Sequence, residues 1–126
     1  MDRTDLDKLD VQPYEGIDTA LKAIRRHVGR IPDSGFLGTR AGTEYNWISF
    51  KEAYETAEAL SHGCKALNLC PETEGEGDGK PWRFMGIQSK NRAEWSLLNI
   101  AGMFQSVTSV AFFDTLGEDA MKFVIE

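Results

Sequence analysis

The segment from Arg83 to Phe113 constrains the fold more than any other part of the sequence. Residues 83–88 have the composition of a strand, residues 91–104 that of a helix, and residues 107–113 that of a second strand. A strand, a helix and a strand within about 30 residues indicate a right-handed βαβ unit with parallel strands. The helix is apolar around most of its girth and the second strand does not alternate, which is typical of elements covered on more than one side. The sequence therefore predicts an α/β fold.

The residues after this unit predict a larger domain than the chain itself contains. A further helix is expected from Thr115–Glu118 onward, and it reaches Glu126 without a glycine stop, a basic last turn or a following strand. Two parallel strands with exposed apolar edges do not make a finished sheet. We therefore expect the sequence to be an incomplete part of a larger α/β domain.

Two helices and a hairpin are expected before the βαβ unit. Apolar residues recur at helical spacing from Ile17 to Val28, and Gly29 and Pro32 follow as stop signals. Residues 36–40 and 44–48 are strand-like runs on either side of a glycine-containing turn, which indicates a hairpin.

The clearest helix start in the chain follows the hairpin. Ser49 and Glu52 have the Ser-x-x-Glu spacing of a capping box, in which each side chain satisfies the other residue's backbone N–H. The helix that follows is expected to bury one apolar stripe, made of Phe50, Ala53, Tyr54, Ala57, Leu60, Cys64 and Leu67.

Two polar segments lie outside the predicted helices and strands, one at the start of the chain and one before the βαβ unit. Residues 1–15 carry four aspartates and little apolar content, so we expect a disordered acidic lead-in. Residues 71–81 are acidic and glycine-rich, and we interpret them as a loop between two structural units. The predicted division is a lead-in at 1–15 and a partial domain at 16–126.

Composition excludes some classes of function. The net charge of −6 over 126 residues, with 41% hydrophobic and 27% charged residues, is ordinary for a globular protein and argues against a nucleic-acid partner. No apolar run approaches the roughly 20 residues of a membrane span, and the first residues do not resemble a signal peptide. The two cysteines, Cys64 and Cys70, fit a reducing compartment better than a disulfide framework. We expect an intracellular location.

The acidic loop does not have the pattern of a ligand site. A phosphate loop needs Gly-x-x-x-x-Gly-Lys-Ser/Thr after a strand, but here Glu74 and Pro81 flank residues 75–80 and nearby carboxylates would repel a phosphate. A calcium loop that began at Glu72 would need a glutamate at its twelfth position, which is Arg83. We interpret the segment as a surface loop.

Other reactive side chains have no partner at the spacing that catalysis or metal binding requires, and they are interpreted as structural or surface residues: His27, His62, Cys64, Ser49 and Ser89. The three tryptophans, Trp47, Trp82 and Trp95, are expected to pack in the core.

Four polar residues follow the two predicted parallel strands, where α/β proteins place their ligand sites: Asn91, Arg92, Glu94 and Asp114. Helix capping and the electrostatics of a helix start account for Asn91 and Glu94 without a ligand. A structural role is therefore favoured for these four residues, and a substrate-facing role stays open as the alternative.

Three segments together resemble the long-chain acyl-CoA synthetases of the adenylate-forming superfamily. Residues 45–52 are similar to the family's Tyr-x-Trp-Ile-Ser-Tyr-x-Glu, residues 86–95 to Gly-Ile-x-x-x-Asn-Arg-Pro-Glu-Trp, and residues 113–117 to Tyr-Asp-Thr-Leu-Gly. The order and spacing agree from about Gly16 to the end. The sequence departs from the family at Ala93 and Ala111, where proline is usual, and at Phe113, where tyrosine is usual.

The resemblance implies the N-terminal part of the large domain of an adenylate-forming enzyme. Such an enzyme joins a fatty acid to AMP, using ATP and Mg²⁺, and then transfers the acyl group to coenzyme A. In the family the phosphate loop, the magnesium ligands and the acyl tunnel lie downstream, and this chain has no Thr-Ser-Gly-Thr-Thr-Gly loop. We therefore assign no catalytic, cofactor-binding or metal-binding residue here, and we expect the chain alone to be inactive.

The partners implied for the complete enzyme are fatty acid, ATP, coenzyme A and the remainder of the same polypeptide, in the cytoplasm or on the cytoplasmic face of a membrane such as the endoplasmic reticulum. Two alternatives stay open. One is a free-standing small α/β interaction module without catalysis, and the other is an adenylating enzyme that activates a different acid.

Overall fold

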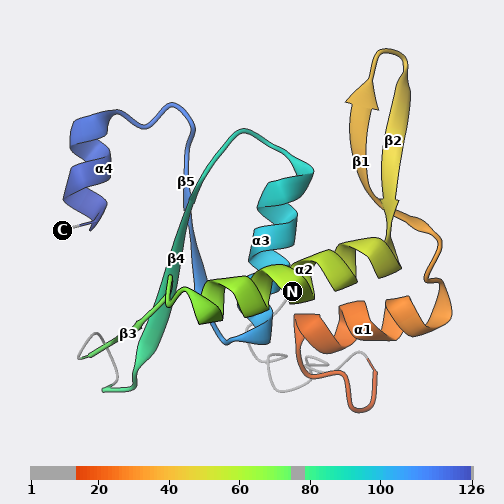
Figure 1. Ribbon diagram of the computed structural model, residues 1–126, viewed down its shortest axis with the longest axis horizontal. Helices are drawn as coiled ribbons and strands as arrows, with labels where there is room; N and C mark the ends of the chain where they lie inside the picture. Colours follow the sequence, from red (N-terminus) through yellow and green to blue (C-terminus); the bar gives the residue numbers. More distant parts are fainter. Residues whose placement is uncertain (1–13, 75–78, 126) are drawn as a thin grey trace, which may run out of the picture.

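The computed structural model describes residues 14–74 and 79–125, so residues 1–13 of the lead-in expected at 1–15 and the middle of the acidic loop lie outside the described residues. Figure 1 shows an extended arrangement, with a hairpin at one end and a small sheet with a C-terminal helix at the other. The elements are α1 (Ala20–Arg30), β1 (Gly35–Ala41), β2 (Glu44–Ser49), α2 (Phe50–Ala66), β3 (Glu72–Thr73), β4 (Trp82–Gln88), α3 (Ala93–Phe104), β5 (Thr108–Phe112) and α4 (Glu118–Ile125).

The hairpin and the βαβ unit are confirmed. β1 and β2 pair antiparallel as a two-stranded sheet, and β4 and β5 pair parallel from Phe84 opposite Thr108 to Gln88 opposite Phe112. The short strand β3 pairs antiparallel with β4 and gives the second sheet the order β3-β4-β5. The interpretation of residues 71–81 as loop throughout was therefore wrong for Glu72 and Thr73, because the Arg83 guanidinium lies 2.8 Å from the Glu72 carboxylate and supports this pairing.

Helix α2 begins at the predicted capping box. The Ser49 backbone N–H donates to a Glu52 carboxylate oxygen at 2.8 Å, and the Glu52 N–H donates to the Ser49 hydroxyl oxygen at 3.2 Å. Helix α1 begins at Ala20, later than the apolar pattern from Ile17 suggests, because the Thr19 hydroxyl caps it by accepting from the Lys22 N–H.

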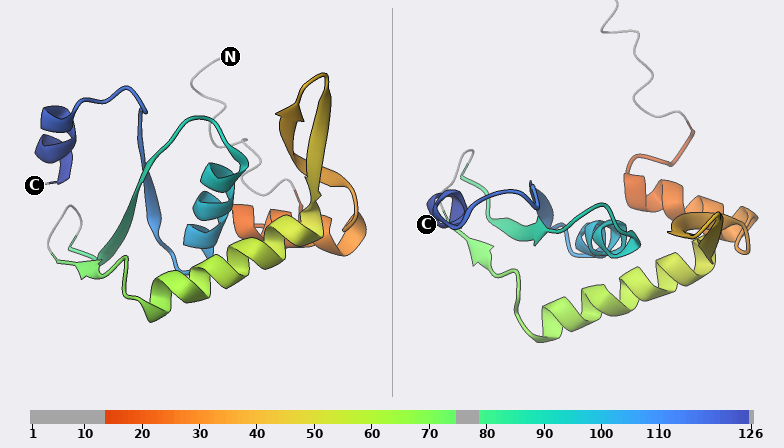
Figure 2. Two further views of the ribbon diagram at one scale, coloured as in Figure 1. Left: turned by 45° about the horizontal axis from the view of Figure 1, so that its top comes forward. Right: turned by 90° about the horizontal axis from the view of Figure 1, so that it is seen from above.

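The core lies where α2 packs against α3. Ala57, Ile100 and Ala101 form its buried centre, with α1 and the start of β1 packed around it. Figure 2 shows α2 running along one side of α3, with the hairpin rising near the N-terminal end of α2. Small side chains at the centre let the two helix backbones approach closely, as ridge-and-groove packing requires.

The predicted stripe on α2 was only partly right. Leu60 and Leu67 are 37% and 71% exposed, whereas Ser61 is 2% exposed. The buried face of α2 consists of Ala53, Ala57 and Ser61, and Gln105, the residue directly after α3, donates to the Ser61 hydroxyl at 3.0 Å. A buried serine is tolerated there because its hydrogen bond is made across the helix pair.

The sheet is covered less than its sequence predicted. Ile87 of β4 is buried, but no residue of β5 is, and Phe84 is 40% exposed. Helix α3 packs against β5, and α4 borders a groove over the sheet that is lined by Phe84, Val110, Phe112, Met121 and Ile125. The expectation that both faces of β5 are covered does not hold within this chain, because the apolar residues of α4 are themselves mostly exposed.

Candidate functional site

The carboxyl ends of β4 and β5 meet at one edge of the sheet, as parallel strands require. The side-chain amide of Gln88 donates to the Phe113 carbonyl at 3.4 Å and joins the two ends. A cleft of about 450 Å³ opens here, lined by the residues just after each strand, including Lys90, Asn91 and Asp114. Two of the four polar residues singled out in the sequence, Asn91 and Asp114, are thus brought together.

Arg92 and Glu94 are engaged with each other. The Arg92 Nε donates to one carboxylate oxygen of Glu94 at 3.0 Å and Nη2 donates to the other. The hydrogen bond from Arg92 lowers the pKa of the Glu94 carboxyl, and Glu94 in turn raises the pKa of Arg92. A carboxylate held ionised by a neighbouring guanidinium is a poor proton acceptor near neutral pH.

This ion pair borders a second cleft, of about 770 Å³, between the N-terminal end of α3 and the hairpin. Leu37, Thr39 and Tyr45 line its hairpin side, and Asn91 lies on the border of both clefts. The sequence does not predict this cleft, because the distance between the hairpin and α3 depends on how both pack on α2. Asp114 does not line it, so the four candidates do not form one site.

The predicted N-cap of α3 was wrong. Arg92, in an extended conformation, occupies the N-cap position, and no side chain makes a cap hydrogen bond. Asn91 therefore lies one residue outside the cap. Glu94 does stand in the first helical turn, where a negative charge is favourable.

The histidines and serines have the structural or surface positions that were predicted. His27 and His62 are exposed, and the His27 ring lies 5.5 Å from that of Phe50. Ser49 caps α2, and the Ser89 hydroxyl donates to the Lys90 carbonyl at 2.9 Å. Across residues 14–74 and 79–125, no three histidine, cysteine or acidic side chains are grouped so that they could hold a metal ion.

The cysteines and tryptophans differ from expectation. Cys64 is half-buried, whereas Cys70, outside the predicted stripe, is buried, and both are free thiols. Trp47 and Trp82 are 61% and 38% exposed, so core packing was wrong for both, while Trp95 is half-buried.

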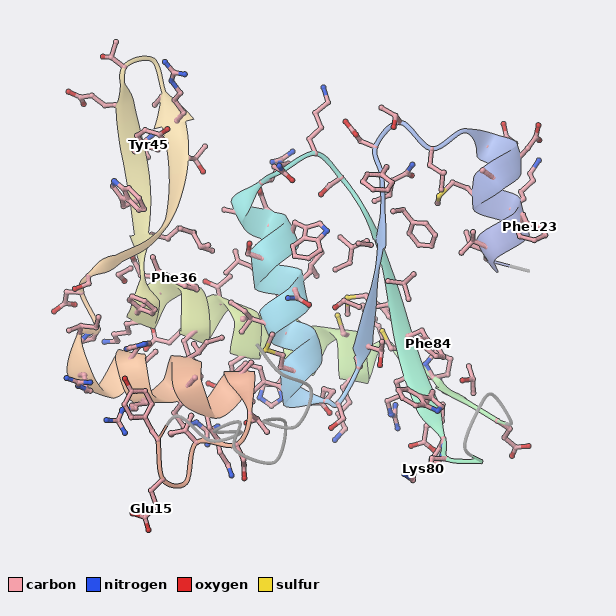
Figure 3. The ribbon with its side chains drawn as sticks, turned by 180° about the vertical axis from the view of Figure 1, so that it is seen from behind. Glu15, Phe36, Tyr45, Lys80, Phe84 and Phe123 are labelled. Atoms are coloured by element: carbon pink, nitrogen blue, oxygen red, sulfur yellow. The ribbon has the colours of Figure 1, made fainter. Side chains whose placement is uncertain are left out.

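Trp47 is held on the surface of the hairpin by glycines that carry no side chain beneath it. A Cβ on Gly38 would lie 2.9 Å from the indole, and one on Gly35 would lie 3.2 Å away. Tyr45 stands beside Trp47, with ring centroids 5.8 Å apart. Figure 3 shows Tyr45 far out on the hairpin and Phe123 on α4 at the opposite end of the molecule.

No protein-family profile matches the chain. It is similar to fatty acyl-CoA synthetase A of Dictyostelium discoideum, with 34% identity over 78% of this chain and 14% of that protein. Fatty acyl-CoA synthetase B of the same organism is 32% identical over 66% of this chain and 11% of its own length. Long-chain-fatty-acid–CoA ligase 6 of Homo sapiens is 29% identical over 89% of this chain and 15% of its own length.

Several synthetases of this kind thus match most of the chain, while the chain spans a small share of each of them. The mixed helix and strand content, the hairpin and the βαβ unit agree with an α/β partial domain. None of the described helices is both long and apolar enough to span a bilayer. Because fatty acyl-CoA synthetase A is 34% identical over 78% of the chain, the chain belongs to the long-chain acyl-CoA synthetase family.

Proposed function

We propose that this chain supplies the first helices and strands of the large domain of a long-chain fatty acid–CoA ligase and is inactive alone. The complete enzyme would convert ATP, fatty acid and coenzyme A into acyl-CoA, AMP and pyrophosphate. The observation that carries this proposal is the match to synthetases over most of the chain and over only 11–16% of their length.

The chemistry of the described residues supports inactivity. Activating a carboxylate with ATP needs donors that bind phosphates, carboxylates that hold magnesium and a cation that neutralises developing charge. Arg92 and Glu94 neutralise each other, and the cleft at the ends of β4 and β5 contains one acidic side chain, Asp114. These residues do not fit a magnesium–nucleotide site, so no catalytic step is assigned to them.

Fatty acid-dependent exchange of pyrophosphate into ATP tests the claim of inactivity. The purified 126-residue chain should give no exchange above a blank without enzyme, while human long-chain-fatty-acid–CoA ligase 6, run in parallel, gives the positive signal. Exchange by the chain that depends on fatty acid would refute the proposal.

A chimera tests whether the chain can act as part of a synthetase. The matching segment of fatty acyl-CoA synthetase A is replaced by residues 16–126, and acyl-CoA formation is measured with a panel of fatty acids. We expect this chimera to form acyl-CoA. A second chimera that also carries Ala57→Leu should be less active, because the larger side chain overpacks the contact between α2 and α3. A soluble, folded and inactive chimera would favour the alternative of a separate interaction module.

We also propose an intracellular, cytoplasm-facing location for the complete enzyme. The two unpaired thiols support it, since a reducing compartment keeps such cysteines free. Fluorescence microscopy of the tagged chain and of the complete protein would test it, and secretion into the medium would contradict it.

A further inference from the structure

The two cysteines of the chain line one cavity at the C-terminal end of α2. This cavity has a volume of about 360 Å³ and is bordered by α2, the start of β4 and the end of α3. Besides Cys64 and Cys70, its lining includes Ser61, Arg83, Met85 and Gln105. Neither thiol takes part in the sites described above, and the two are separated by only five residues of chain.

The backbone between the cysteines forms a sharp reversal. The Leu69 N–H donates to the Cys64 carbonyl at 3.0 Å, and the Asn68 N–H donates to the Lys65 carbonyl at 3.1 Å. This pair of bonds, with Asn68 in the left-handed region at φ +50°, is a Schellman motif. The motif holds Leu69, the residue before Cys70, against the backbone of Cys64, and both cysteines line the same cavity.

The two thiols differ in access. Cys64 is half-buried and borders the open cavity, whereas Cys70 is 8% exposed. Burial raises the pKa of the Cys70 thiol, negative charge on Cys64 raises it further, and Arg83 opposes both effects. The effect of Cys64 on the pKa of Cys70 agrees with the position of both residues at one cavity.

We propose that Cys64 and Cys70 form a reversible intramolecular disulfide, with glutathione disulfide as the oxidant. The Cys64 thiolate attacks one sulfur of glutathione disulfide, the S–S bond breaks, and one glutathione thiolate leaves and takes up a proton. The Cys70 thiol then loses its proton and attacks the Cys64 sulfur, which releases the second glutathione. The two protein thiols lose two electrons in total, and one glutathione disulfide becomes two glutathione thiols.

The disulfide would tie the last turn of α2 to the segment that leads into β3. Oxidation would thereby fix the position of the Glu72–Arg83 pairing relative to the α2–α3 core. This proposal does not depend on the enzymatic proposal, because its readouts are thiol chemistry and mass.

Equilibration with mixtures of reduced and oxidised glutathione tests the proposal on the 126-residue chain. Reactions are run in buffer and in concentrated urea, quenched with acid, and the remaining free thiols are then alkylated. Intact mass gives the number of alkylated thiols, and peptide mapping locates the disulfide bond. We expect one Cys64–Cys70 disulfide within each chain. The equilibrium constant for its formation from glutathione disulfide should be roughly tenfold larger in buffer than in urea, because in urea only the short chain between the cysteines keeps the thiols close. A constant in buffer equal to or below the urea value, or disulfides that join two chains, would overturn the proposal.

Two conservative variants test the order of events. Cys70→Ser should accumulate a mixed disulfide with glutathione at Cys64, because the second attack is removed. In the Cys64→Ser variant, Cys70 should stay a free thiol in buffer, because it is buried. In urea Cys70 should react with glutathione disulfide, because unfolding exposes it. Equal amounts of mixed disulfide on the two variants in buffer would contradict the proposed roles.

Discussion

At the scale of single residues, the interaction between Ser49 and Glu52 determines where α2 begins. Their reciprocal hydrogen bonds begin α2 directly after the last residue of β2, so the hairpin passes into the helix without an intervening loop. The Ser49 hydroxyl also donates to the Glu52 carboxylate at 2.8 Å. The start of α2 is thus fixed by two residues three positions apart, which is why the sequence predicted it correctly.

Replacing Ser49 with alanine should lower the free energy of unfolding by about 1 kcal/mol, because the Glu52 N–H loses its acceptor. Urea unfolding followed by circular dichroism measures the change. The matched control is Thr56→Ala, on the exposed side of the same helix. Thr56→Ala should leave stability unchanged or raise it slightly, since alanine has the higher helix propensity. Equal losses in both variants would show that the cap contributes nothing.

Glu52 should make stability depend on pH. Hydrogen bonds from Ser49 lower the pKa of the Glu52 carboxyl below its ordinary value of 4.5. The unfolded chain therefore binds more protons than the folded chain just below that value, so the contribution of Glu52 is present above about pH 4.5 and is lost as the pH falls through the lowered pKa.

The Glu52→Gln variant should accordingly lose less stability than the parent chain between about pH 6 and about pH 3. Urea unfolding at a series of pH values gives the comparison. Glu58→Gln, which removes a charge from α2 outside its first turn, is the matched control. Parallel pH profiles for the parent chain and Glu52→Gln would contradict the argument.

At the scale of the elements, the contact between α2 and α3 holds the molecule together. Its centre consists of Ala57 and Ala101, whose side chains are 0% and 1% exposed. Gly102 also lies in this region, where a Cβ would come within 3.2 Å of the Val107 carbonyl oxygen. Small residues are required here because any larger side chain would push the helices apart or press α3 against β5.

Ala57→Leu should therefore destabilise the chain by about 1–3 kcal/mol, because the added volume cannot be accommodated between two closely packed helices. Thermal and urea unfolding measure the effect. Ala59→Leu, on the exposed side of α2, adds the same atoms without a packing partner and should be nearly neutral. Similar unfolding curves for the two variants would show that the α2–α3 contact is loose.

The sequence predicted the elements whose signals are local, and it missed features that depend on packing partners. The capping box, the hairpin turn and the βαβ unit follow from residues close together in the chain. The buried face of α2 does not, because its Leu60 and Leu67 have the right spacing but no helix opposite them. Strand β3 depends on an ion pair across eleven residues, which no periodicity reveals.

The candidate site was predicted in part for the same reason. Strand order placed Asn91 and Asp114 at one edge correctly, because parallel pairing dictates it. The pairing of Arg92 with Glu94 and the cleft beside the hairpin depend on side-chain and element positions that only the structure gives.

At the scale of the whole molecule, several strongly exposed apolar residues lie near the C-terminal end of the described residues. Phe113, Phe123 and Ile125 are 78%, 84% and 71% exposed. Ile125 lines the groove over β4 and β5, and Phe113 and Phe123 are the sequence neighbours of Phe112 and Val124, which line it too. Exposed apolar residues gathered in one region promote association.

The isolated chain should therefore self-associate as its concentration rises, and Phe123→Lys should raise the concentration at which this begins. Light scattering after size-exclusion chromatography measures the mass of the species. Leu67→Lys, at an exposed leucine at the end of α2, is the matched control and should have a smaller effect. A monomer at all concentrations, with cooperative melting, would show that the exposed region does not drive association.

The base of the hairpin is held by the first turn of α2 and by the start of β1, which packs against the core, whereas its tip lies at the outer end of the molecule (Figure 1). The tip is therefore the part of the hairpin farthest from the contact between α2 and α3. A small tilt of α2 against α3 would sweep the tip through a much larger arc and widen or narrow the 770 Å³ cleft. A substitution at Ala57 or Ala101 that shifts the two helices would therefore change the width of a cleft that neither residue lines.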